Sequence, residues 1–86
     1  MIQLLGTEAA CGDSTGTASN FSGASIVRLY NSTTSDHLVT LEQTGGTDIG
    51  TLTLTAKGVV ELRKLPTDKI FAANAGVLGV AVGFTY

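Results

Sequence analysis

The sequence is poor in the residues that build catalytic and metal sites. Its 86 residues include one Cys, one His, one Pro and no Trp, and only 14% of them are charged. One Cys and one His exclude a disulfide framework, and they exclude a zinc finger within one chain. The net charge of −2 and the pI near 5.0 exclude a generally basic protein that binds nucleic acid.

Long hydrophobic runs are missing as well. The apolar run from Ile2 to Leu5 is too short for a signal peptide, and no basic residue precedes it. The longest stretch without charge, residues 70–86, is interrupted by Gly, Asn and Thr. It also falls short of the roughly 18 to 20 apolar residues that a membrane-spanning helix needs. We therefore expect no targeting segment and no membrane partner.

The residues that are present favour one small folded domain. Hydrophobic residues make up 43% of the chain, which is the opposite of the composition of a disordered protein. A chain of this length forms one domain. We expect residues 1–86 to form a single β domain, in which residues 1–23 are a Gly/Ser/Thr-rich arm or a first hairpin.

Alternation of apolar and polar residues dominates from residue 24 onward and predicts strands. Turn-forming residues, including the Gly45-Gly46 pair, separate the alternating runs, which cover residues 25–30, 37–43, 51–55, 59–64 and 77–86. The spacing predicts an all-β fold, an antiparallel β-sandwich or small flattened barrel (jelly-roll or Ig-like) of about six to eight strands. The expected core residues are Val27, Leu29, Val39, Leu41, Leu52, Leu54, Val60, Leu62, Val80, Val82 and Phe84.

The last predicted strand has one large apolar face and one small face. We expect the large face, which includes Leu78, Val80 and Val82, to lie in the core. The small face consists of Gly79, Ala81, Gly83 and Thr85. Small residues allow another backbone or a bulky side chain to approach. This face is therefore either a flat surface in solvent or a contact with another subunit.

The first 23 residues lack periodicity apart from the short apolar run near their start. Such an arm either packs in its own sheet or adds to the sheet edge of a neighbour. Together with the small face of the last strand, it predicts a homo-oligomer, with subunit contacts at Ile2, Leu4, Leu5, Gly79, Ala81 and Gly83.

Catalytic chemistry has few candidates in this sequence. His37 lies at a junction between a turn and a strand, where a surface residue is expected, and Cys11 lies 26 positions before it. Asp13, Asp36 and Asp48 fall in predicted turns, where Asp is favoured for local reasons. We expect no enzyme activity, no cofactor, no metal site and no nucleic-acid partner.

Residues 24–86 resemble small virion-associated proteins of tailed bacteriophages, notably those of marine and cyanobacterial phages. The resemblance depends on the order of five segments: IVRLYN (26–31), VTL (39–41), GTLTL (50–54), KGVVELRK (57–64) and PTDKIFA (66–72). A valine-rich strand near the terminus follows them. The resemblance implies a compact β-sandwich that decorates phage heads or builds tail parts as an oligomer, and it supplies no catalytic residue.

The leading hypothesis is therefore a structural protein of the virion, a capsid decoration or cement subunit that binds the major capsid protein. The resemblance implies a trimer, since such proteins often sit on threefold axes. A tail or fibre component is the first alternative. The alternative from another class is a small β-sandwich that binds carbohydrate, although sugar-binding sites usually use exposed aromatic residues, which are few here.

Overall fold

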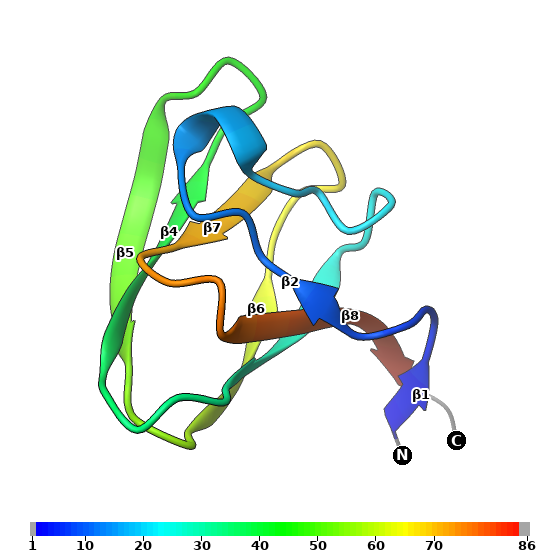
Figure 1. Cartoon of the computed structure of the whole chain (residues 1–86). Coiled ribbons are helices and arrows are strands. Elements are labelled where there is room, and N and C mark those ends of the chain that lie inside the picture. The colour runs from blue at the N-terminus through cyan, green and yellow to red at the C-terminus, as the bar shows by residue number, and fades with distance from the viewer. Residues whose placement is uncertain (1, 85–86) are drawn as a thin grey trace.

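The computed structural model describes residues 2–84, without the side chains of Ile2, Thr15 and Phe84. Two antiparallel sheets pack face to face and form a body of 34 × 31 × 19 Å (Figure 1). The predicted all-β sandwich is confirmed, with eight strands within this range. They are β1 (Ile2–Leu4), β2 (Ala9–Ala10), β3 (Ile26–Asn31), β4 (His37–Glu42), β5 (Asp48–Leu54), β6 (Val59–Arg63), β7 (Lys69–Ala72) and β8 (Val77–Phe84).

The two sheets differ in width. The wide sheet has the order β1-β8-β3-β6, and β2 also pairs with β8. The narrow sheet has the order β5-β4-β7. From β3 onward the chain crosses between the sheets after every strand except β4, which forms a hairpin with β5. The wide sheet thus ends at β6 on one side and at β1 and β2 on the other, and the narrow sheet ends at β5 and β7. The edges of β6 and β5 lie on the same side of the sandwich.

The core lies between the sheets and contains most of the residues that alternation predicts. Val27 and Leu29 of β3 are fully buried against Val39 and Leu54 of the narrow sheet. Leu41, Leu52, Val60 and Leu62 pack around this centre and are partly buried. Full burial of such a side chain is worth about 1.5–3 kcal/mol. The same centre also includes residues that the alternation did not identify: Cys11, Ile70, Ala72 and Val77.

Strand β7 was not predicted, although two of its residues belong to the core. Ile70 and Ala72 pair with Leu41 and Val39, and both are completely buried. The strand has only four residues and follows Pro66. A run this short carries too little alternation to be distinguished from a loop.

The N-terminal segment closes one side of the sandwich by hydrogen bonding to both sheets. Ala9 and Ala10 pair with β8 of the wide sheet, and the Cys11 amide donates to the Val77 carbonyl (3.0 Å). The chain then passes to the narrow sheet, where the Ala72 amide donates to the Gly12 carbonyl (2.8 Å). Ser19 exchanges two main-chain hydrogen bonds with Ile70. Figure 1 shows this crossing in blue, from β2 past the short 3-10 turn Thr15–Thr17 beside β7.

Strand β8 has the opposite orientation to the one we expected. Leu29 lies opposite Gly79 and Val27 lies opposite Ala81 across the β3–β8 pair. Directly opposite residues of an antiparallel pair point to the same side of the sheet. Because Leu29 and Val27 point into the core, the small face of β8 points inward as well. The larger side chains of Leu78, Val80 and Val82 therefore lie on the outer side of the wide sheet and not in the central cluster, although Val80 and Val82 are buried there (4% and 3% exposed). The side chain of Phe84 and residue Thr85, which we placed on the two faces of this strand, lie outside the described part of the structure.

Phe21 fills the space that the small residues of β8 leave inside. A Cβ atom at Gly79 would lie 2.6 Å from Phe21 Cζ and 3.0 Å from Leu29 Cδ2. Phe21, Ser22 and Gly23 all have positive φ angles (53°, 59° and 77°), so the chain makes a left-handed turn here. This conformation costs roughly 1–2 kcal/mol for each non-glycine residue. Packing of the Phe21 ring against the core offsets that cost.

Two buried polar side chains close the ends of the β3–β6 pair. At one end, the Asn31 amide group donates to the carbonyls of Ser35 (2.7 Å) and Leu54 (3.0 Å). At the other end, Lys64 Nζ donates to the Ala24 carbonyl (2.6 Å). Burial lowers the pKa of Lys64, while the nearby Asp68 carboxylate opposes this shift. Lys64 therefore does not belong to a solvated basic surface.

The contact between Phe21 and Gly79 predicts a specific pattern of stabilities. Gly79→Ala lowers the free energy of unfolding by about 1–3 kcal/mol, because the new methyl group overlaps the Phe21 ring. Gly50→Ala is the matched control in another strand, since a Cβ atom there meets nothing within 4 Å. Urea denaturation of both variants measures the difference.

A double-mutant cycle identifies the cause of this loss. In a Phe21→Ala background the overlap with the ring is gone, so Gly79→Ala costs less than it does in the natural sequence. Equal costs in the two backgrounds would contradict the packing of Phe21 on Gly79.

Candidate interaction surface

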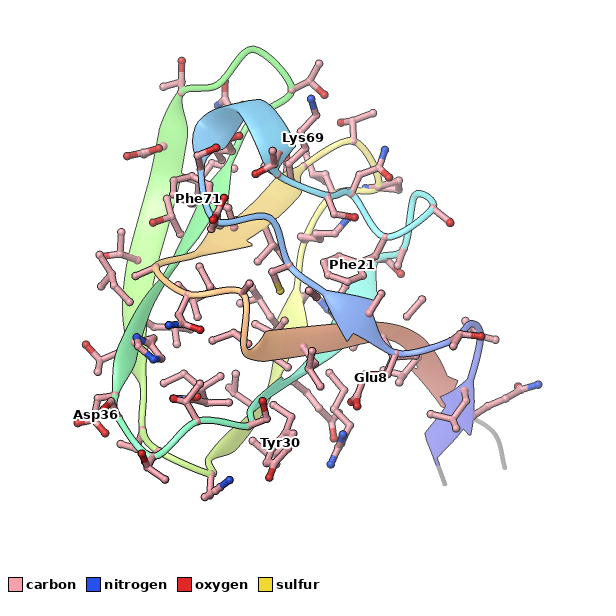
Figure 2. All side chains as sticks on the ribbon, in the orientation of Figure 1. Glu8, Phe21, Tyr30, Asp36, Lys69 and Phe71 are labelled. Atoms are coloured by element: carbon pink, nitrogen blue, oxygen red, sulfur yellow. The ribbon has the colours of Figure 1, made fainter. Side chains whose placement is uncertain are left out.

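The outer face of the wide sheet is more apolar than an antiparallel sheet in contact with water normally is. We use the name outer face for the outward-pointing residues of β1, β3, β6 and β8 together with Glu8 and Ala10 beside β8. Figure 2 shows Tyr30 and Glu8 on one side of β8 and Phe21 on the other, which is the side toward β7. The sheet registers arrange the outer face in three rows that run across the strands.

The first row is apolar, and the third is apolar except at one end. In the first row, Val59, Tyr30, Leu78 and Ala10 lie side by side on β6, β3, β8 and β2. In the third row, Arg63 lies opposite Ile26 and Val82 lies opposite Leu4. The ends of these rows are open, because Val59 is 50% exposed and Leu4 is 67% exposed.

The middle row carries charge. Arg28 lies opposite Glu61 on one side and opposite Val80 on the other. Its Nη1 atom is 3.5 Å from Oε2 of Glu8, which precedes β2 on the far side of β8. The ion pair therefore extends over Val80, which is only 4% exposed, and Val82 in the third row is also buried (3% exposed). Both charged partners are about one-third exposed, so the pair contributes about 1 kcal/mol of stability at most.

The outward surface of the narrow sheet has a different character. Its edge strand β5 presents Thr51 and Thr53, both of which are exposed. Leu38 is the one large aliphatic residue that β4 exposes there, at 47%. Threonine is suited to a strand surface in contact with water. Ile49 on β5 is 49% exposed as well, and Phe71 of β7 lies opposite Thr40. The two surfaces thus differ mainly in their arrangement, because the outer face orders its apolar residues in rows that flank a charged row.

The residues that we expected to contact another subunit have different positions in the structure. β1 pairs with β8 of the same chain, so the arm lies in its own sheet, with Leu4 on the outer face. Leu5 lies 3.4 Å from the position of a Cβ atom at Gly83. Gly79 and Ala81 point into the sandwich, where Phe21 of the same chain takes the place that we assigned to a neighbour at Gly79. The side chain of Ile2 lies outside the described part of the structure.

A groove of about 170 Å³ opens between the unpaired edges of the two sheets. Its lining is almost entirely apolar and comes from Val39, Leu41, Gly50, Thr51, Leu52 and Leu62. Leu62 forms its rim on β6. The closed side of the sandwich, along β7 and β8, is opposite to this open side.

The titratable candidates for chemistry are not brought together. Cys11 is buried in the core, and burial raises the pKa of its thiol to about 11, although a hydrogen bond from its own backbone opposes the shift. Such a thiol stays protonated at neutral pH, and the thiolate is the reactive form. His37 lies at the start of β4 in the narrow sheet. Residues 2–84 contain no group of three His, Cys, Asp or Glu residues placed to hold a metal ion, and no helix long and apolar enough to cross a membrane.

The environment of Cys11 predicts that its thiol reacts only after unfolding. A disulfide reagent at pH 8 leaves the thiol of the folded protein unmodified and labels it fully in urea.

The raised pKa of Cys11 also predicts a pH dependence of stability. Over the range between the two pKa values, the thiol is protonated in the folded protein and ionised in the unfolded chain. Stability therefore falls as the pH rises from 9 toward 11. The variant Cys11→Ala is expected to lack this part of the pH dependence of stability. In the labelling experiment, rapid modification of the folded protein would contradict the burial of Cys11.

The chain was compared with family models, with curated proteins and with solved structures, and none of them matches it.

Proposed function

We propose that this protein is a structural subunit of a tailed-phage virion, which decorates or cements the capsid by docking its outer face on the major capsid protein. The single observation that carries the docking role is the arrangement of the outer face, in which apolar rows that end at the exposed residues Val59 and Leu4 flank a charged row. The resemblance of residues 24–86 to virion-associated proteins supplies the setting. Self-association belongs to the same proposal, and the trimer that the resemblance implies is the alternative to the twofold contact proposed below.

The three rows supply the two kinds of contact that a protein interface needs. The apolar rows lose water mainly at their exposed ends, Val59 and Leu4, when a partner covers them, since Val82 is already buried. The charged row of Glu61, Arg28 and Glu8 lies between them and favours a partner with complementary charges. Charge complementarity contributes mainly to orientation and specificity, while the apolar area contributes most of the affinity.

The outer face is less suited to carbohydrate. Sugar-binding sites usually present an exposed aromatic platform, and Tyr30 is the one aromatic side chain in the three rows. Tyr30 is only partly exposed, between Val59 and Leu78. A protein partner is therefore the better fit to this surface.

The location of the protein tests the proposed function directly. Mass spectrometry of purified phage particles is expected to find the chain in a copy number close to that of the major capsid protein. A few copies per particle would support the tail or fibre alternative. Absence from particles together with specific binding to a glycan array would overturn the proposal in favour of the carbohydrate-binding module.

A pair of substitutions tests the docking surface. Leu4→Lys places a charge in the third row of the outer face, where burial against a partner would be costly. We expect this variant to keep its circular dichroism spectrum and to lose at least tenfold in affinity for capsids that lack the subunit, a loss of about 1.4 kcal/mol. Leu38→Lys is the matched control on the narrow sheet and keeps its affinity. Equal binding by the two variants would contradict docking through the outer face.

A further inference from the structure

The exposed edge of β6 has main-chain groups that are free to pair. The Lys64 amide donates to the Ser25 carbonyl, and the Asn31 amide donates to the Gly58 carbonyl. Hydrogen-bonded pairs alternate along an antiparallel ladder, so residues 58, 60, 62 and 64 are the ones that bond to β3. The N–H and C=O groups of Val59, Glu61 and Arg63 therefore point away from the sheet. Within residues 2–84 they have no hydrogen-bond partner.

The edge of β5, on the same side of the sandwich, is less suited to pairing. Strand β5 has an irregular register, because Leu41 lies opposite Gly50 while Glu42 lies opposite Asp48. Ile49 is thus the extra residue of a β-bulge, which disrupts pairing along an edge strand. Strand β6 has a regular register from Val59 to Arg63.

We propose that β6 pairs antiparallel with β6 of a second copy of this chain, in the register that places Leu62 opposite itself. This register places Glu61 opposite Arg63 of the second copy, and Arg63 opposite its Glu61. Both residues have outward main-chain groups, so each Glu61–Arg63 pair exchanges two N–H···O bonds between the copies. The contact has twofold symmetry, and the same strand serves both subunits.

Charge favours this register over the two neighbouring registers that the main chain permits. Centring on Glu61 would place two carboxylates opposite each other, and centring on Arg63 would place two guanidinium groups opposite each other. Both arrangements are destabilising. Charged side chains on an edge strand normally prevent such pairing. Here the two charges have opposite sign and are two residues apart, so the Leu62-centred register turns both into attractive cross-strand pairs.

The charges of β6 are available for this contact. Both Glu61 and Arg63 are exposed, and within residues 2–84 neither makes an ion pair. Arg28, the cation opposite Glu61, is paired with Glu8. The same register places Val59 (50% exposed) opposite Leu65 (67% exposed) of the second copy. An apolar cross-strand contact therefore lies beside each Glu61–Arg63 pair.

The inner side of β6 is complementary as well. At the centre of the proposed pair, the two Leu62 side chains approach each other as a non-hydrogen-bonded pair, in which side chains lie closest. Leu62 lines the apolar groove between the two open edges. The second copy therefore contributes apolar surface at the mouth of this groove.

Reversal and exchange of the two charges test the pairing in the purified full chain. Sedimentation equilibrium at tens of micromolar is expected to give an even multiple of the chain mass of 8.8 kDa. Arg63→Glu raises the dissociation constant about tenfold or more, because both symmetry-related pairs become repulsive. Glu61→Arg acts in the same way, and the double exchange Glu61→Arg/Arg63→Glu restores association.

A mixture of the two single variants supplies an independent readout. Each Glu61→Arg chain carries two arginines that face the two carboxylates of an Arg63→Glu chain, so the mixture is expected to associate one to one. Asp48→Arg, on β5, is the matched control for the change in net charge and leaves association unchanged. Circular dichroism confirms that each variant is folded.

Amide hydrogen exchange locates the contact on β6. The amides of Glu61 and Arg63 are expected to gain protection as the protein concentration rises, whereas those of Val60 and Leu62 are already bonded to β3. A monomer or a trimer in solution would overturn the proposal, and so would association that neither reversal affects. These outcomes do not depend on the virion assignment, which particle composition tests separately.

Discussion

Main-chain hydrogen bonds between the N-terminal segment and both sheets are the interaction on which the rest of the structure depends. Cys11 bonds to Val77 of the wide sheet, and Gly12 and Ser19 bond to Ala72 and Ile70 of the narrow sheet. A sandwich with sheets of unequal width would otherwise leave part of its inner surface uncovered. The segment covers that surface with Cys11 and Phe21. Because Phe21 needs room, β8 turns its small residues inward and its large residues outward. The outer face is thus a consequence of how the sandwich is closed.

Alternation predicted most of the strands and most of the core, for a reason that β3 makes clear. Val27 and Leu29 alternate with Ile26, Arg28 and Tyr30, and the face without charge is the buried one. Burial of a strand face depends on local side-chain chemistry in such cases. The same reasoning failed for β8, where both faces are uncharged. Alternation shows which residues share a face but leaves open which face is inside. The decisive partner, Phe21, lies in a segment without periodicity.

The candidate surfaces were predictable only in part. The small residues of β8 were expected to admit a bulky side chain, and Phe21 of the same chain lies at Gly79. That the arm and this face contact another subunit stays a prediction. The three rows of the outer face depend on the registers of β2, β3, β6 and β8, and no local pattern contains these registers. The opposite charges of Glu61 and Arg63 were visible in the sequence. Their significance required knowing that β6 is an edge strand and which of its main-chain groups point outward.

The pairing of β1 and β2 with β8 also has a consequence for the order of folding. Residues from opposite ends of the described chain must meet before the wide sheet is complete, and such nonlocal contacts form slowly. During synthesis the N-terminal segment appears before β8 and waits for it. Its Gly-, Ser- and Thr-rich composition keeps its tendency to aggregate low during that interval. Strands β3 to β7 can form the β4–β5 hairpin and their contacts between the sheets meanwhile, but their core stays open on one side until β8 arrives.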